Sequence, residues 1–208
     1  MQSFLDELTE QRWDDHRYYH HNRINQSLHV VSALCFLSSY VLLFTNPTAA
    51  VLIGWILAMV IRQIGHFFFE PKGYDDVNDA TFEYKEKIKV GYNLHRKQVL
   101  LGLWVLSPLV LVASPTLFGY FGPAEPGISS FAHRVSVLWL WLGGAALLFR
   151  VAQLAVTRSA RTGIVWLTKI LTDPFHDIML YHRAPLAVLR GEMMAPAAES
   201  KLAARSPR

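Results

Sequence analysis

The chain has little cysteine and few charged residues. Cys35 is the only cysteine among 208 residues, and a single thiol excludes both a disulfide framework within the chain and a metal site built from several thiolates. Asp, Glu, Lys and Arg make up 17% of the residues, whereas hydrophobic residues make up 52% and the mean hydropathy is +0.22. This balance is unusual for a soluble domain and favours an integral membrane protein.

Four apolar runs approach the length of about 20 residues that a helix needs to cross a hydrocarbon core. Each run is apolar on all faces, whereas a soluble amphipathic helix has a polar stripe. We therefore predict an all-α membrane bundle with four transmembrane helices, at about residues 28–44, 49–69, 99–118 and 136–156, and with cytoplasmic surface helices. Residues 1–192 are predicted to form one membrane domain, and residues 193–208 a disordered tail rich in Ala, Pro and Ser.

The basic residues predict how the helices are oriented. Three Lys or Arg precede Leu28, six lie between Glu70 and Lys97, and eight follow Val156. Under the positive-inside rule, both termini and the middle loop face the cytoplasm. This asymmetry explains the net charge of +4, so we expect no nucleic acid partner. The first 27 residues have no apolar region of the kind that a cleavable signal peptide requires, and we expect the N-terminus to be retained.

Eight of the nine histidines fall on the cytoplasmic side of this topology, and His133 is the exception. They can therefore meet without crossing the bilayer. Imidazole is a good ligand for iron, zinc and copper, and oxygen-activating iron sites combine histidines with a carboxylate. The eight residues are His16, His20, His21, His29, His66, His95, His176 and His182.

Two polar clusters flank the predicted spans. Arg62, His66 and Glu70 are four residues apart, so on a helix they share one face near its cytoplasmic end. The alternative is an Arg that reaches the membrane surface beside a Glu that caps the helix. After the fourth span, Asp173 is placed to cap a helix that begins at Pro174. The first turn of that helix would then present His176 and Asp177 either to the site or to solvent.

The stretch HRYYHHNRINQSLH, residues 16–29, allows two interpretations. The spacing of His16, His20 and His21 has the form of the HxxxHH boxes of membrane di-iron desaturases and hydroxylases, although the chain has no other paired histidines. In the other interpretation, His20, Asn25 and His29 act with the later segment GHFFFE.

This second combination resembles the membrane family of 2-hydroxy fatty acid dioxygenases, the iron-dependent enzymes of fatty acid α-oxidation. The matching positions of the first segment are Tyr19, His20, His21, Asn22, Asn25 and His29. Those of the second segment are Trp55, Gln63, Gly65, His66, Phe69 and Glu70.

The resemblance implies an Fe(II) site that uses molecular oxygen to shorten a 2-hydroxy fatty acid, or a related lipid, by one carbon. It implies His20, His29, His66 and Glu70 as catalytic residues and His20, His29 and His66 as metal ligands. We add His176, which lies outside the matching segments, as the fourth candidate ligand. Supporting or substrate-binding roles are expected for His21, Asn25, Arg62, Asp177 and His182. Arg62 or Arg23 is the candidate partner of the substrate carboxylate.

Three classes of function remain open at this point: an iron-dependent lipid dioxygenase, a membrane di-iron hydroxylase or desaturase, and a membrane protein without enzymatic activity. We expect the bilayer and a fatty-acid-like substrate as partners. The expected location is the inner membrane of a bacterium, or the endoplasmic reticulum in a eukaryotic host. Substrate chain length, metal identity and oligomeric state do not follow from the sequence.

Overall fold

The structure is a computed structural model that describes residues 3–70, 72–75, 78–123 and 126–195. It is helical, and its described residues form no β-strand, only two isolated bridges. The all-α prediction is therefore confirmed. The elements are α1 Phe4–Tyr19, α2 Arg23–Leu42, α3 Pro47–Leu52, η1 Ile53–Met59, α4 Val60–Ile64, η2 Gly65–Phe69, α5 Phe82–Ile88, α6 Leu94–Leu106, α7 Pro108–Ala113, α8 Ile128–Thr157, α9 Ala160–Tyr181 and α10 Ala184–Leu189.

Three helices of the described chain are long and apolar enough to cross a membrane. They span Pro47–Phe69, Leu94–Ala113 and Ile128–Thr157. The second of these lies about five residues before the predicted span 99–118, because the chain leaves the helix after Ala113. The predicted span 28–44 falls in α2, which is not among the three, so four spans are not confirmed. The cytoplasmic surface helices are not confirmed either.

Buried polar side chains explain why α2 differs from the three apolar helices. Asn25, Gln26, His29, Ser32 and Ser39 are all buried in it. The two serine hydroxyls donate to the neighbouring helix: Ser32 Oγ to the Ala58 carbonyl at 2.8 Å and Ser39 Oγ to the Ala50 carbonyl at 2.6 Å. Protein groups of the neighbouring helix thus satisfy the two serines of α2.

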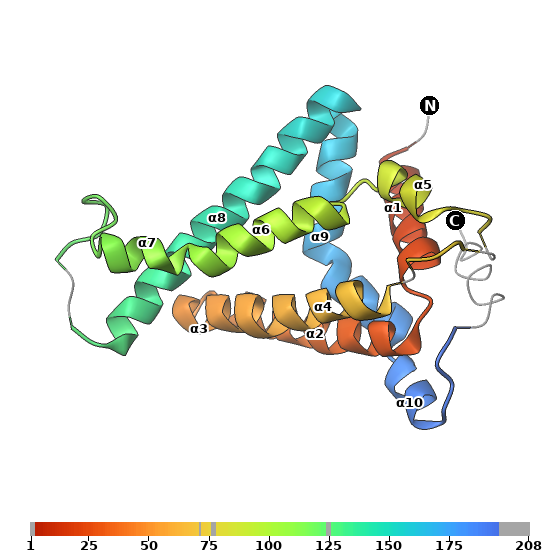
Figure 1. Ribbon diagram of the computed structural model, residues 1–208, viewed down its shortest axis with the longest axis horizontal. Coiled ribbons are helices and arrows are strands. Elements are labelled where there is room, and N and C mark those ends of the chain that lie inside the picture. The colour runs from red at the N-terminus through yellow and green to blue at the C-terminus, as the bar shows by residue number, and fades with distance from the viewer. Residues whose placement is uncertain (1–2, 71, 76–77, 124–125, 196–208) are drawn as a thin grey trace.

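The segment from Pro47 to Phe69 forms one continuous helix with two π-helical stretches, η1 and η2. It runs alongside α2. In Figure 1, α8 passes the α3 end of this helix and crosses α6, and α9 packs against α2. Helical backbone ends at Glu70, whose ψ of 130° is extended, as the sequence predicted. Wide π-helical turns are often found at functional sites, and here η2 carries His66.

An aromatic core holds the membrane helices together at a distance from the polar end. The rings of Trp55 and Trp104 are stacked with centroids 5.8 Å apart, and Trp139 lies 5.3 Å from Trp104. Trp139 Nε1 donates to Ser107 Oγ at 3.1 Å. Gly143 of α8 admits the edge of Trp55, since a Cβ there would lie 2.6 Å from the indole.

At the opposite end of the bundle, α1, α5 and α10 gather around the start of α2 and the end of η2 (Figure 1). The hydroxyl of Tyr19 donates to the Lys85 carbonyl at 2.6 Å, and Lys89 Nζ lies 3.4 Å above the Tyr19 ring. These contacts fold α5 back onto α1. Residues 193–195 also pair with residues 21–23, and the remainder of the predicted disordered tail, residues 196–208, lies outside the described residues.

The prediction that a helix begins at Pro174 is wrong, because Pro174 lies inside the 22-residue helix α9. Proline in a helix interior costs about 3 kcal/mol. The helix continues through it because Lys169 and Asp173 form an ion pair across the break at 2.7 Å, and because Trp166, Asp173 and Asp177 are buried on both sides of it. Asp173 is therefore an ion-pair partner and not a helix cap.

Substitution of Gly143 by Ala should destabilise the aromatic core, because the new methyl group would overlap the Trp55 ring. We expect a loss of about 1–3 kcal/mol, measured by thermal or denaturant unfolding in detergent. Gly144→Ala is the matched control, since nothing lies within 4 Å of its Cβ position, and a gain of up to about 1 kcal/mol is expected there. Equal stability of the two variants would contradict this packing.

Candidate metal centre

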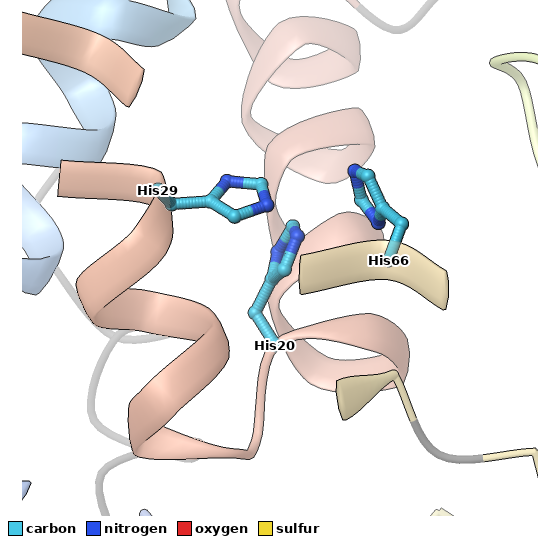
Figure 2. Close-up of side chains that lie close together, drawn as sticks. All are labelled: His20, His29 and His66. Atoms are coloured by element: carbon cyan, nitrogen blue, oxygen red, sulfur yellow. The ribbon is translucent and has the colours of Figure 1, made fainter. Parts of the chain in front are cut away.

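Three histidines from three segments converge at the polar end of the bundle. His20 is the C-cap residue of α1, His29 lies on the second turn of α2, and His66 lies in η2. Each offers a ring nitrogen within 4.8 Å of the other two, and Figure 2 shows the rings pointing toward one another. The structure thus brings together the three residues that the sequence singled out first.

The inner nitrogens of this trio fit a metal ion. Nε2 of His20 and Nε2 of His29 are buried and have no hydrogen-bond partner among the described residues. Buried polar atoms nearly always have a partner, so two orphans on adjacent rings need an explanation. Neutral imidazole nitrogens are good ligands of iron, zinc and copper, and a shared metal ion would satisfy both atoms.

Carboxylates hold the outer nitrogens of two rings. His66 Nδ1 lies 2.8 Å from Glu70 Oε2, and His29 Nδ1 lies 3.4 Å from Asp177 Oδ2. An Nδ1–H that donates to a carboxylate leaves the Nε2 lone pair for a metal, and this arrangement is common around metal-bound histidines. In this geometry Glu70 and Asp177 orient ligands rather than act as ligands.

The electrostatics keep the site in the form that metal binding requires. Burial lowers the pKa of His20 well below its usual value, with smaller contributions from His29 and Arg62. Its imidazole is therefore neutral at pH 7. Burial alone would raise the pKa of Asp177, but the adjacent Arg62 guanidinium, 2.9 Å away, and His29 outweigh this and lower it. Asp177 is therefore an ionised acceptor for His29.

The asparagines of the first segment build the turn that presents His20. Asn22 caps α2, accepting from the Ile24 amide at 2.8 Å. Asn25 Nδ2 donates to the Tyr19 carbonyl at 3.0 Å, and Gln26 Nε2 donates to the His20 carbonyl at 2.7 Å. The residues between His20 and His29 thus position the turn that presents His20.

Gly65 explains the Gly-His pair of the second segment. A Cβ at this position would lie 2.2 Å from Asn25 Oδ1 and 3.7 Å from the His29 ring. Only glycine lets η2 approach α2 closely enough to place His66 beside His29. The two sequence segments therefore contact each other where Gly65 faces the Asn25 side chain, as well as at their histidines.

The structure does not bring the remaining predicted site residues into the trio. His176 is half-buried and lines a small cavity together with His20, Arg62 and Asp177. Burial lowers the pKa of His176 to about 4. His182 is exposed and contacts only the Met179 carbonyl among the described residues, at 3.1 Å. His21 is buried, with Nε2 3.4 Å from Asn78 Nδ2.

Tyr181 is a neighbour of the site that sequence reasoning missed. It is buried, its ring lies 5.8 Å from that of His20, and its hydroxyl lies 3.0 Å from His16 Nδ1. It stands one helical turn after Asp177 on α9. This spacing of four residues is the signal that could have identified it.

Gly65→Ala should disturb the centre without removing any candidate ligand, because the methyl group must displace either Asn25 or η2. We expect metal affinity to fall on the order of tenfold or more, measured by competition with a chelator. Gly102→Ala on α6 is the control, since its Cβ position is open. Unchanged metal affinity in Gly65→Ala would show that metal binding does not depend on the close approach of η2 and α2.

Comparison with known proteins agrees with this geometry. Residues 7–84 match the family model described as 2-hydroxy-palmitic acid dioxygenase Mpo1-like. No curated protein and no solved structure matches the chain. The matched region runs from α1 into α5, so it contains all three histidines of the trio and Glu70 but not α9 with its Asp177. The match supports the resemblance carried by the two histidine segments, and it covers residues 7–84, a little more than a third of the chain.

Proposed function

We propose that the chain is an iron(II)-dependent membrane dioxygenase that shortens a 2-hydroxy fatty acid, or a related lipid, by one carbon. The observation that carries this proposal is the trio of His20, His29 and His66, with ring nitrogens within 4.8 Å of one another and two buried Nε2 atoms unpaired in the described structure. The name of the matching family, that of a dioxygenase, supports the type of reaction.

The proposed ligands are the Nε2 atoms of the three histidines. A bound Fe(II) would supply open coordination positions for molecular oxygen and for the oxygen atoms of the substrate. Three histidines leave such positions free, and His176 remains the proposed fourth ligand because it lines the same cavity as His20. Iron is preferred to zinc or copper on the strength of the family name alone, since imidazole suits all three metals.

The chain's own residues orient the rings and exclude water. Glu70 accepts from His66 and Asp177 accepts from His29, which fixes the tautomer of each ring. Arg62 in turn donates to the Oδ2 of Asp177 at 2.9 Å and keeps that carboxylate charged. His20 and His29 are 4% and 0% exposed, so substrate would meet them in a site from which bulk water is excluded.

The position of the trio suits a lipid substrate. His66 lies three residues before Phe69, the last residue of a candidate membrane span, and the chain leaves the helix at Glu70. A fatty acid can therefore keep its tail among the apolar helices while its polar head reaches the histidines. With the positive-inside rule, and with α2 as a fourth crossing, we propose that this end and both termini face the cytoplasm, with the protein in a bacterial inner membrane or, in a eukaryote, in the endoplasmic reticulum.

The di-iron alternative finds less support in the described residues. They contain one group of at least three potential ligands, and its members are the three histidines already named. A pair of irons would need more ligands than this group supplies, as di-iron proteins with four glutamates and two histidines illustrate. His16, the first residue of the HxxxHH pattern, instead contacts the Tyr181 hydroxyl.

Metal analysis tests the proposed centre directly. Protein purified without an affinity tag and supplied with Fe(II) under anaerobic conditions should contain about one iron per chain, and His29→Ala and His66→Ala should each lose it. His95→Ala is the control, because His95 is exposed on α6. The intact protein should also convert 2-hydroxyhexadecanoic acid to a product one carbon shorter, detected by mass spectrometry. No bound metal, or no shortened product, would overturn the proposed function.

Glu70→Gln should weaken metal binding while the fold is retained. A neutral amide oxygen can still accept from His66 Nδ1 but makes the ring a poorer ligand, so iron affinity should fall about 10- to 100-fold. The matched control is Glu83→Gln, on the exposed side of α5. Equal iron affinity in both variants, measured by chelator competition, would show that Glu70 does not support His66.

A further inference from the structure

A second small cavity adjoins the trio on the side of His66 and is rich in lysine. Charged residues of its wall are Glu70, Lys72, Glu86, Lys89 and Lys97. Phe82 and Leu94 add apolar surface to the same wall. Half of the eight wall residues, Glu86, Lys89, Leu94 and Lys97, follow the region matched by the family model, which ends at residue 84.

The two glutamates of this cavity are already occupied by partners in the protein. Glu70 Oε2 lies 2.8 Å from His66 Nδ1, and Glu70 Oε1 lies 3.1 Å from Lys89 Nζ. Glu86 Oε2 accepts from the Leu94 amide at 2.6 Å, and its Oε1 lies 3.6 Å from Lys89 Nζ. Lys89 therefore pairs with both carboxylates, which neutralise its positive charge.

Lys97 is different, because its ammonium has no hydrogen-bond or ion-pair partner in the part of the chain that the structure describes. It is half-buried in the first turns of α6. Its side chain lines the same cavity as His66. An ammonium that is partly removed from water needs an anion, and the protein does not provide one within contact distance.

Two other cations near the trio, Arg62 and Lys169, are paired with protein carboxylates, and Lys72 in the wall of the cavity beside His66 is exposed. Arg62 lies 2.9 Å from Asp177 and 3.9 Å from Asp173. Lys169 forms ion pairs with both Asp15 and Asp173. The cavity beside His20 therefore has equal numbers of positive and negative side chains, whereas the cavity beside His66 has an excess of positive charge.

We propose that Lys97 binds the carboxylate of the fatty acid substrate in the cavity beside His66. This inference rests on the proposed function, and it replaces Arg62 and Arg23 as the partner expected from the sequence. Leu101 and Trp104 follow Lys97 by four and seven residues on α6, so they continue the same face of the helix. An alkyl chain whose carboxylate lies at Lys97 would meet these apolar side chains as it enters the membrane region.

The test is a binding experiment that does not depend on turnover. The full chain in detergent micelles, without added iron and with oxygen removed, is titrated with radiolabelled 2-hydroxyhexadecanoic acid and with its methyl ester. Four proteins are compared: the wild type, Lys97→Met, Lys97→Arg and Lys87→Met. Lys87→Met is the matched control, since Lys87 is an exposed lysine on α5 that does not line the cavity.

The wild type should bind the acid more tightly than the ester. Lys97→Met should lose about tenfold or more of its affinity for the acid, the loss expected for a charge-assisted hydrogen bond, and should bind the ester as the wild type does. Lys97→Arg should retain most of the preference for the acid, and Lys87→Met all of it. Unchanged ester binding shows that the Lys97→Met protein is folded.

Three results would overturn the inference: no preference of the wild type for the acid, unchanged acid affinity in Lys97→Met, or equal losses for acid and ester. Failure of the proposed function is a separate outcome. In that case the wild type would bind the acid in a Lys97-dependent way but would not release a shortened product when supplied with iron and oxygen.

Discussion

The architecture depends on keeping three neutral imidazoles buried side by side with two of their Nε2 atoms unpaired within the described protein. Burying a polar atom without a partner is unfavourable by about 1–3 kcal/mol. The surrounding structure counters this cost with a capped α2, a glycine contact at Gly65 and carboxylates on the outer nitrogens. The arrangement is that of a site preorganised for a ligand at its centre.

The site joins the N-terminal segment to α9, which lies about 150 residues later in the chain. Asp177 connects them, because it faces His29 and Arg62 at the same carboxylate oxygen. The match to the Mpo1-like family ends at residue 84, so α9 and α6 are parts of the environment that the family model does not cover. Differences in substrate recognition within such a family would arise most readily in these parts. Lys97 lies in one of them, α6.

His20, His29 and His66 were predicted from the resemblance of the two histidine segments to a known family, and the structure places their rings together. The predicted span at 28–44 is not confirmed, because α2 contains the buried polar residues Asn25, Gln26 and His29 beside its apolar C-terminal half. Pro174 was misread because an ion pair and burial on both sides outweigh its helix-breaking tendency. Lys97 could not be assigned, because only the folding of α6 against η2 brings it to the same cavity as His66.

The central claim is that one metal ion is shared by the Nε2 atoms of His20, His29 and His66. X-ray absorption spectroscopy of the iron-loaded protein measures this most directly, since it reports the imidazole ligands of iron and any second iron nearby. The account predicts three or four imidazole ligands for each iron and no iron–iron scattering. A spectrum with fewer than three imidazole ligands, or with scattering from a second nearby iron, would contradict it.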